Sequence, residues 1–414
     1  DNYPPESNAP AIRSSTHAQR WVAEGHDVTV VTCFPNFPEG KVFGGYRQTV
    51  YKREVLDTVD VVRVPTLIYP NRGTVLRILD FLSFMVTGTI AALCVRRPDV
   101  VVATSPQFFT AVAGWLVSAL RRRPFVFEVR DLWPDSVVAV GAMKDGVVIK
   151  AIRRLEQFLY RRADLIVAVT HAFRDALVAR GINGDKIVVV SNGIDARRFT
   201  PGPPPAELVQ KLGLAGKIVV SYIGTAGMAH GLSLVLDAAQ ACRTRLPEVQ
   251  FLIVGAGAEL DRLKTEAAER GLANVTFVGR VPHAETIHYW RLSAMTLVLL
   301  KDVPLFRKVI PSKIFEAMAT GTPIITNVRG EVWNVLESVG AAELVAPDSA
   351  DALAAAIEAL ARDPARRRAL SVAGAEAAKR FDRAVLARQM LDALQRLVAG
   401  GPATPRPAAR DPAA

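Results

Sequence analysis

The sequence VIPSKIFEAMATGTPIIT, residues 309–326, contains the features of a short helix followed by a buried strand. Pro311 suits the first turn of a helix, where a missing backbone N–H costs nothing. Gly321 suits the position just after a helix ends, and the apolar segment PIIT follows it directly. Helical spacing of apolar residues followed by a short apolar run predicts one α/β unit.

Charged and polar residues surround the start of this predicted helix. Glu316 lies near its N-terminal end, where unpaired backbone N–H groups attract phosphate. An anion site with a carboxylate one turn deeper suits a nucleotide-sugar, with the diphosphate at the helix start and the ribose at Glu316. The alternative is an ordinary helix on which Lys313 and Glu316 pair at the surface. The neighbouring residues that offer cation or hydroxyl contacts are Arg307, Lys308, Ser312 and Lys313.

Strand candidates alternate with helical patterns in two successive parts of the chain. Apolar, β-branched runs joined by helical segments indicate parallel sheets covered on both faces. The fold class predicted is α/β, with two doubly wound, Rossmann-like domains facing across a cleft. The strand candidates are 28–33, 61–65, 100–104, 125–129, 165–169 and 187–191 in the first part, and 217–224, 250–255, 274–279, 295–300, 323–326 and 342–346 in the second.

Domain boundaries follow from the prolines of TPGPPPAEL and from the order of the patterns. The segment NYPPE leads straight into a helical pattern, so a first strand is expected to be missing from the first domain. We predict an N-terminal domain over 1–199, a linker over 200–216, a C-terminal domain over 217–378, a helix over 379–398 that packs back on the N-terminal domain, and a disordered tail over 399–414.

The composition is that of a globular protein. Half of the 414 residues are hydrophobic and 22% are charged, which excludes a disordered chain. The three cysteines (Cys33, Cys94 and Cys242) are far apart, which favours reduced thiols. The opening DNYPPESNAP has neither a basic region nor an apolar one, so no signal peptide is expected and a cytoplasmic protein is predicted.

The net charge of +11 includes several arginine clusters, among them 121–123, 153–154 and 161–162. Aromatic residues are not interleaved with them and no nucleic-acid module is recognisable, which favours anionic lipid over nucleic acid. Two apolar segments, 81–95 and 108–120, are too short for membrane spans. We interpret them as core helices, with a helix resting on the inner face of the membrane as the alternative.

Two glycine-containing loops follow strand candidates in the second part of the chain. Gly255-Ala-Gly257 suits close approach of the backbone to a ligand, but the third glycine of a dinucleotide fingerprint is missing. The loop 224–232 suits contact with a phosphate or sugar, or else a tight turn. His230 in that loop offers a donor to a phosphate.

Five segments together resemble one large family. GHDVTVVT, SNGID, VGAGAEL, NVTFVGRVP and KIFEAMATGTPII occur in the order found in retaining glycosyltransferases of the GT4 type, which have the GT-B fold. The resemblance covers nearly the whole chain. NYPPE and EVRDLWPDS are further similar to the WbuB-like branch, whose members build colanic acid and O-antigen.

The resemblance implies roles for residues of the second domain. Glu316 matches the glutamate that binds the ribose hydroxyls, whereas Lys308 stands where relatives have a glutamate that contacts the donor sugar. Thr225 and His230 stand where relatives have an arginine and a lysine for the diphosphate. We therefore hypothesise that Arg307, Lys308 and Lys313 supply these cations. The other expected donor contacts are Ser312, Gly224, Gly255, Gly257, Arg280 and Val281.

In the first domain the family's His-Asp pair falls on Arg130 and Asp131. Together with Lys308 these are the expected catalytic residues. An arginine suits bidentate contact with a donor sugar or acceptor phosphate, and Asp131 suits orientation of the acceptor hydroxyl. The alternative is an ion pair at a strand end. Asn8, Ala9 and Arg13 are expected near the cleft.

The activity implied is transfer of a sugar, with retention, from a nucleotide diphosphate donor to a polyprenyl-diphosphate-linked acceptor. UDP is favoured by family frequency and an N-acetylated or deoxy amino sugar is expected. Absence of an Asp-x-Asp pair and of a His/Cys cluster favours a metal-independent reaction without a cofactor. A nucleotide-sugar 2-epimerase and a non-catalytic scaffold that binds nucleotide-sugar or membrane are the alternatives.

Overall fold

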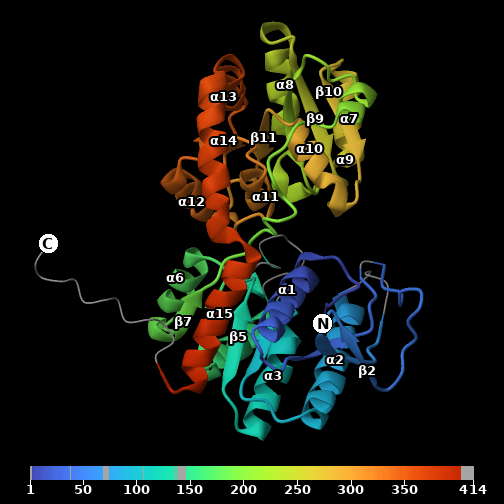
Figure 1. Cartoon of the computed structure of the whole chain (residues 1–414), viewed down its shortest axis with the longest axis vertical. Coiled ribbons are helices and arrows are strands. Elements are labelled where there is room, and N and C mark those ends of the chain that lie inside the picture. Colours follow the sequence, from blue (N-terminus) through green and yellow to red (C-terminus); the bar gives the residue numbers. More distant parts are fainter. Residues whose placement is uncertain are drawn as a thin grey trace, which may run out of the picture. The chain divides into compact units, whose positions relative to one another are not determined.

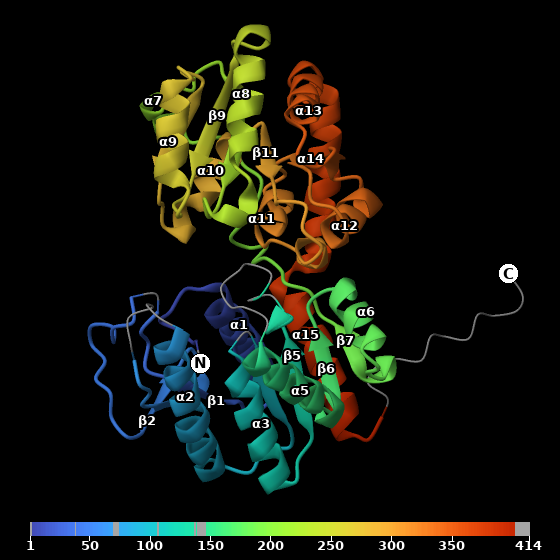
Figure 2. The same ribbon diagram turned by 180° about the vertical axis from the view of Figure 1, so that it is seen from behind.

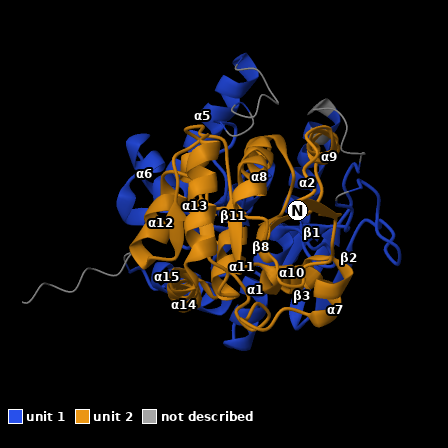
Figure 3. Ribbon diagram, turned by 90° about the horizontal axis from the view of Figure 1, so that it is seen from above, with its two compact units in different colours: residues 1–191, 383–414 blue, residues 192–382 orange. Residues whose placement is uncertain are grey.

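The chain forms two compact units in a computed structural model that describes residues 2–37, 39–68, 74–105, 107–135, 138 and 146–401. Unit 1 contains residues 1–191 and 383–414, and unit 2 contains residues 192–382 (Figure 3). The segment predicted as a linker belongs to unit 2 and includes a helix, α7 (Ala206–Lys211). Most of the predicted disordered tail lies outside the described residues.

Unit 2 is built on one parallel sheet of six strands, and every strand predicted for this part of the chain is confirmed. The strand order is β10-β9-β8-β11-β12-β13. The order reverses between β8 and β11, and ligands of such sheets bind at the carboxyl ends of the strands near this point. The strands are β8 (Ile218–Ile223), β9 (Val249–Val254), β10 (Val275–Gly279), β11 (Met295–Val298), β12 (Ile324–Thr326) and β13 (Ala342–Leu344).

Helices cover both faces of this sheet because its strands carry apolar residues on both sides (Figure 1). One apolar cluster joins the sheet to α8, α9 and α13, and a second joins it to α10, α11 and α12. The helices are α8 (Ser233–Arg245), α9 (Leu260–Glu269), α10 (Thr286–Leu292), α11 (Lys313–Ala319), α12 (Glu331–Val339), α13 (Ala350–Arg362) and α14 (Pro364–Ala378), with 3-10 turns η2 (Met228–His230), η3 (His283–Glu285), η4 (Phe306–Lys308) and η5 (Lys379–Phe381).

The strands of unit 1 lie in two sheets. Strands β4-β5-β6-β7 form a parallel sheet, and β1-β3-β2 form a second sheet in which β2 is antiparallel to β3. Strand β2 was not predicted, because KREVL contains three charged residues in a row and no continuous apolar run. The strands are β1 (Thr29–Cys33), β2 (Lys52–Leu56), β3 (Val59–Val64), β4 (Val101–Thr104), β5 (Phe125–Val129), β6 (Leu165–Ala168) and β7 (Ile187–Val189).

The last helix of the described chain, α15 (Arg383–Val398), belongs to unit 1 and lies beside its first helix, α1 (Ala9–Ala23) (Figures 1 and 2). The indole N–H of Trp21 donates to the Ala387 carbonyl at 2.9 Å, and Leu386 and Met390 pack against β5 and β6. The described part of unit 1 also contains the helices α2 (Thr74–Cys94), α3 (Phe108–Arg121), α5 (Val147–Arg162) and α6 (His171–Ala179), and the 3-10 turn η1 (Gly184–Lys186).

Candidate active site

Helix α11 begins at Lys313, two residues after Pro311, and is seven residues long. Its first turn is closed by a bond from the Ile314 N–H to the Pro311 carbonyl, at 3.1 Å. Gly321 follows the helix with a φ of +68°, as its predicted role at the helix end requires. The helix is buried between the sheet and its neighbours, so its charged residues are held in an enclosed environment.

Glu316 is buried, and each of its carboxylate oxygens has a partner. The Trp290 indole N–H donates to Oε2 at 3.0 Å, and Nε2 of His283 lies 3.0 Å from Oε1. The Glu316 side chain is 11% exposed and that of His283 is 40% exposed. Because a carboxylate has about four acceptor positions, these two contacts orient Glu316 and leave capacity for ligand hydroxyls.

Lys313 does not form the surface ion pair with Glu316 that was the alternative for this helix. Its ammonium nitrogen is buried, has no hydrogen-bond partner, and lies 3.9 Å from the centre of the Tyr222 ring. Burial lowers the pKa of Lys313 to about 7, although the charge of Glu316 acts to raise it. The Lys313 side chain therefore exchanges between its charged and neutral forms near pH 7. The face of the Tyr222 ring stabilises the charged form.

The Lys313 ammonium group lies at the end of β8, next to the point where the strand order reverses. A methyl group placed on Gly224 would be 3.2 Å from Nζ. Gly224 follows β8 directly with a φ of +139°, a conformation that residues other than glycine rarely adopt. An unpaired cation at the carboxyl end of a central parallel strand suits an anionic ligand.

The other cations expected near this helix have different environments. Arg307 makes a two-pronged ion pair with Asp302, with both N–O distances 2.8 Å, and its side chain is 47% exposed. Lys308 lies in the same 3-10 turn and is half-buried. Ser312 is exposed and its side chain does not cap the helix. Of the cations hypothesised to hold a diphosphate, Lys313 has the environment that suits the role best.

Gly255 and Gly257 allow two loops to touch. A methyl group on Gly255 would lie 1.8 Å from the Gly224 carbonyl oxygen, and one on Gly257 would lie 2.3 Å from that of Ala226. The loop after β9 thus packs directly on the loop after β8. The structure therefore gives these glycines a packing role, where the sequence had suggested close approach to a ligand.

The remaining predicted donor contacts lie at the ends of neighbouring strands. Thr225 is exposed after β8, and Arg280 is exposed after β10, followed by the half-buried Val281. The His230 ring packs against Tyr222 and its Nδ1 lies 3.3 Å from the Gly227 carbonyl. Burial, together with the charge of Lys313, lowers the pKa of His230 to about 4, so this ring is neutral at pH 7.

In unit 1 the residues expected near a cleft serve the structure of the unit itself. Asn8 caps α1 by accepting from the Ala11 N–H at 3.0 Å, and Ala9 is the exposed first residue of that helix. Arg13 is buried and forms an ion pair with Glu128 at 2.8 Å. Because its remaining N–H groups donate to backbone carbonyls at the end of β7, Arg13 is not available to a ligand.

Arg130 follows β5 and differs from Arg13 in its contacts. Its backbone N–H donates to the Ser105 hydroxyl at 2.8 Å, which places it at the adjoining ends of β4 and β5. Its Nε and Nη1 atoms are buried and have no hydrogen-bond partner in the described part of the chain. The alternative interpretation of Arg130 and Asp131 was an ion pair at the strand end. Such an ion pair does not account for the two unpaired donor atoms of the guanidinium. Asp131 follows it and is half-buried.

Several residues of these sites were not predicted. His283, Trp290 and Tyr222 contact the predicted Glu316 or Lys313, and Glu128 pairs with the predicted Arg13. His283 had a sequence signal, because it directly follows NVTFVGRVP, one of the five segments that carry the family resemblance. Trp290 and Glu128 had none, since their partners are 26 and 115 residues away.

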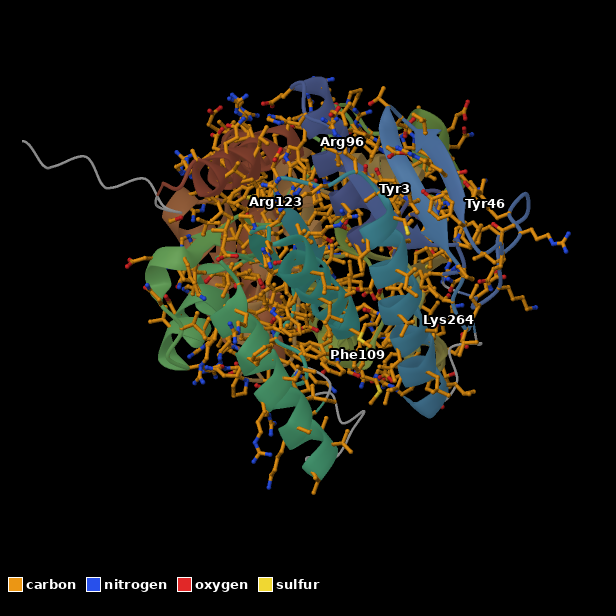
Figure 4. All side chains as sticks on the ribbon, turned by 90° about the horizontal axis from the view of Figure 1, so that it is seen from below. Tyr3, Tyr46, Arg96, Phe109, Arg123 and Lys264 are labelled. Carbon is orange, nitrogen blue, oxygen red and sulfur yellow. The ribbon has the colours of Figure 1, made fainter. Side chains whose placement is uncertain are left out.

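One face of α2 is apolar and exposed. Leu76, Leu79, Val86 and Ile90 recur at helical spacing, and their exposure rises from 37% to 58% along the helix. Figure 4 shows Arg96 and Arg123 beside the C-terminal ends of α2 and α3. Across the described residues, no helix combines the length and the apolar character needed to cross a membrane. The described residues likewise contain no cluster of three His, Cys, Asp or Glu side chains able to hold a metal ion.

Comparison with known families assigns both halves of the chain. Residues 10–193 match the glycosyl transferase 4-like domain, and residues 206–377 match the glycosyl transferases group 1 domain. WcaI of Escherichia coli K12, a glycosyl transferase assigned to colanic acid biosynthesis, is 26% identical over 86% of this chain and 89% of its own length. The glycosyltransferase WbjE of Pseudomonas aeruginosa is 28% identical over 64% of this chain and 66% of its own.

Solved structures share the fold. Sucrose-phosphate synthase from Thermosynechococcus elongatus superposes with a TM-score of 0.72, at 20% identity, over 95% of both chains. HepE from Anabaena, solved in complex with UDP-glucose, superposes with a TM-score of 0.64, at 21% identity, over 82% of this chain and 86% of its own. With both domains matched in order, the chain belongs to the GT4-type glycosyltransferases of the GT-B fold.

Proposed function

We propose that this glycosyltransferase moves a sugar from a nucleotide diphosphate donor to a polyprenyl-diphosphate-linked acceptor during assembly of a bacterial surface polysaccharide. The names of WcaI and WbjE support this class of pathway. The UDP-glucose complex of HepE supports UDP as the nucleotide. We further propose an N-acetylated or deoxy amino sugar, retention of the anomeric configuration, and a reaction that needs no metal.

The observation that carries the proposal is the pairing of Lys313 and Glu316 on one buried helix. Lys313 is an unpaired ammonium group at the end of β8, and Glu316 is a carboxylate oriented by two neighbours. The first suits a diphosphate and the second suits the ribose hydroxyls of the same nucleotide. A nucleotide donor therefore fits this part of unit 2 in both charge and hydrogen-bonding capacity.

In the proposed reaction the bond from the anomeric carbon to the donor phosphate oxygen breaks and a bond to the acceptor oxygen forms. The acceptor hydroxyl gives its proton to the departing phosphate oxygen. Lys313 stabilises the negative charge that develops on the diphosphate, an effect worth about 2.7–4 kcal/mol for one well-placed donor. Glu316 binds the part of the donor that does not react, so it contributes mainly to donor affinity.

The direct test is UDP release by the purified full-length chain, supplied with a panel of UDP-sugars and a polyprenyl-diphosphate monosaccharide. We expect release that requires both substrates and continues in excess EDTA. NMR of the new glycosidic bond should show a retained configuration, and an inverted product would contradict the proposal. Conversion of the donor without any acceptor would instead identify an epimerase.

The donor site is tested by Glu316→Gln, with Glu337→Gln as its control because Glu337 is exposed on α12. Loss of the carboxylate charge should raise the donor KM about tenfold, equivalent to about 1.4 kcal/mol, with a smaller effect on kcat. The control should resemble the unaltered enzyme. Equal donor KM values in all three proteins would place the nucleotide elsewhere.

We also propose that the exposed apolar face of α2 rests on the lipid surface that presents the acceptor. The apolar stripe of Leu76, Leu79, Val86 and Ile90, together with arginines at the end of the helix, suits an anionic membrane. Flotation with vesicles containing phosphatidylglycerol should recover the protein. A Val86→Gln/Ile90→Gln variant should remain unbound, and equal recovery of both proteins would contradict this surface.

A further inference from the structure

Buried charges meet where β4, β5 and β7 of unit 1 end. Glu128 on β5 and Arg13 on α1 form an ion pair in which both side chains are at most 7% exposed. Arg13 also donates to the carbonyls of Val190 and Ser191, at 2.9 and 2.6 Å. These contacts satisfy Arg13 and hold α1 against the sheet.

Arg130 adds a second positive charge to this cluster, and within the described part of the chain no second negative charge acts on it. Glu128 and Arg13 are the charged groups that act on Arg130, and burial lowers the pKa of Arg130 to about 10, which leaves it charged at pH 7. His17 lies in the same cluster, and burial with the charge of Arg13 lowers its pKa to about 3, so it is neutral. Two arginines against one glutamate leave one positive charge uncompensated.

Such a charge is costly in a folded protein. Burial of an ionised group without a partner is far more unfavourable than burial of a paired one. Two of the N–H-bearing atoms of Arg130, Nε and Nη1, have no acceptor among the residues that the structure describes. The backbone of Arg130 is fixed at the strand end by its bond to Ser105. A buried positive charge with unpaired donors is expected where a ligand supplies the acceptor.

The chemistry of Arg130 indicates the class of ligand. A guanidinium group presents parallel donors that match two oxygens of a phosphoryl group. Its position after β5 places it at the carboxyl edge of a parallel sheet, where ligands of such sheets bind. We infer that Arg130 anchors a phosphate-binding site of unit 1, and that the phosphate bound there belongs to the polyprenyl-diphosphate acceptor. Only the second half of this inference rests on the proposed function.

The site itself is tested with inorganic pyrophosphate as the probe, in a Lys313→Met background that removes the proposed diphosphate cation of unit 2. Calorimetry should detect pyrophosphate binding to Lys313→Met. Addition of Arg130→Met should weaken that binding at least tenfold, whereas addition of Arg154→Met, at an exposed position on α5, should not. Equal binding in all three proteins, or none in the first, would overturn the site. This measurement needs no turnover, so its outcome is independent of the proposed reaction.

The source of the phosphate is tested by steady-state kinetics of Arg130→Met and Arg130→Lys with Lys313 intact. If the acceptor is the ligand, the acceptor KM should rise at least tenfold in Arg130→Met, with partial recovery in Arg130→Lys and an unchanged donor KM. A rise in the donor KM alone would assign the phosphate to the donor and overturn the acceptor assignment.

Thermal unfolding separates a binding role from a structural one. Because Arg130 has no hydrogen-bond partner for two of its nitrogens, Arg130→Met should keep or raise the Tm. Arg13→Met should lower the Tm, since it leaves Glu128 without its ion-pair partner. An equal fall in Tm for both variants would show that Arg130 acts as a structural partner of Glu128 and would contradict the inference.

Discussion

Lys313 in unit 2 and Arg130 in unit 1 occupy equivalent places, each near the carboxyl end of a parallel strand and each with buried nitrogen atoms that lack a hydrogen-bond partner. Their surroundings differ. Lys313 lies over the ring of Tyr222, which attracts a cation only weakly, whereas Arg130 lies beside the Glu128–Arg13 ion pair. Lys313 therefore loses its proton near neutral pH, whereas Arg130 stays protonated there.

The largest effect is expected where the ion pair of unit 1 is broken. Arg13→Met should lower the free energy of unfolding by about 3–5 kcal/mol, because Glu128 remains buried without its partner. Urea denaturation measures this, with Arg154→Met as the surface control. A decrease in unfolding free energy below about 1 kcal/mol would mean that Arg130 pairs with Glu128 in place of Arg13. Arg130 would then have a partner, and the difference between Arg130 and Lys313 would not hold.

The next effect concerns catalysis in unit 2. Lys313→Met should lower kcat/KM by about 10²–10³-fold, because the charge developing on the leaving diphosphate loses its stabilising cation. The same change should raise stability at pH 7, since it removes a buried charge whose ammonium nitrogen has no hydrogen bond to lose among the described residues. Initial rates and urea denaturation of one preparation test both statements. Full activity in Lys313→Met would show that a different cation stabilises the leaving diphosphate.

The third prediction uses pH to separate the two cations. Burial lowers the pKa of Lys313 to about 7, so the free enzyme loses this positive charge as pH rises above 7. Affinity for a UDP-sugar, whose diphosphate does not titrate in this range, should then fall by up to about tenfold per pH unit between pH 7 and pH 9. Calorimetric titrations should show this slope in the unaltered enzyme and none in Lys313→Met.

The unfolding free energy should move in the opposite direction over the same range. A lysine whose pKa is lowered in the folded protein binds fewer protons there than in the unfolded chain. Stability should therefore increase from about pH 7 toward the pKa of an unfolded lysine, about 10.4. Lys313→Met should lack this increase. An identical pH profile of stability in both proteins would show that Lys313 is already charged and paired.

The smallest effect is expected at the support of Glu316. Trp290→Phe removes one hydrogen bond to this carboxylate and should raise the donor KM by only about two- to threefold, because the charge remains and His283 still orients the other oxygen. Donor titration measures the change. An effect equal to that of Glu316→Gln would mean that orientation, and not charge, determines donor affinity.

The sequence was sufficient to predict both sets of parallel strands, because each is a continuous apolar run between helical patterns. It was also sufficient to predict the end of α11 at Gly321. It was not sufficient for β2, whose three consecutive charged residues give no apolar run and whose edge position depends on antiparallel pairing with β3. The local sequence pattern is enough to predict the buried parallel strands, whereas an edge strand such as β2 depends on the neighbouring strand with which it pairs.

The site residues divide in the same way. Glu316 and Lys313 were found from the spacing of one helix, yet the aromatic contact of Lys313 depends on Tyr222, which lies far away in the sequence. Arg13 was expected to be available to a ligand, but its ion pair with Glu128 depends on a residue 115 positions away. Residue type and spacing therefore identify candidate groups, while burial and partners, which decide their charge, come from the folded chain.

The return of α15 to unit 1 has a consequence for synthesis of the protein. Leu386, Met390 and Leu394 cover β5 and β6, so unit 1 lacks part of its apolar core until the last helix leaves the ribosome. Unit 2, which is continuous from 192 to 382, is complete before that point. The core of the unit translated second can therefore be completed first, whereas the core of the N-terminal unit is completed only when α15 has been synthesised.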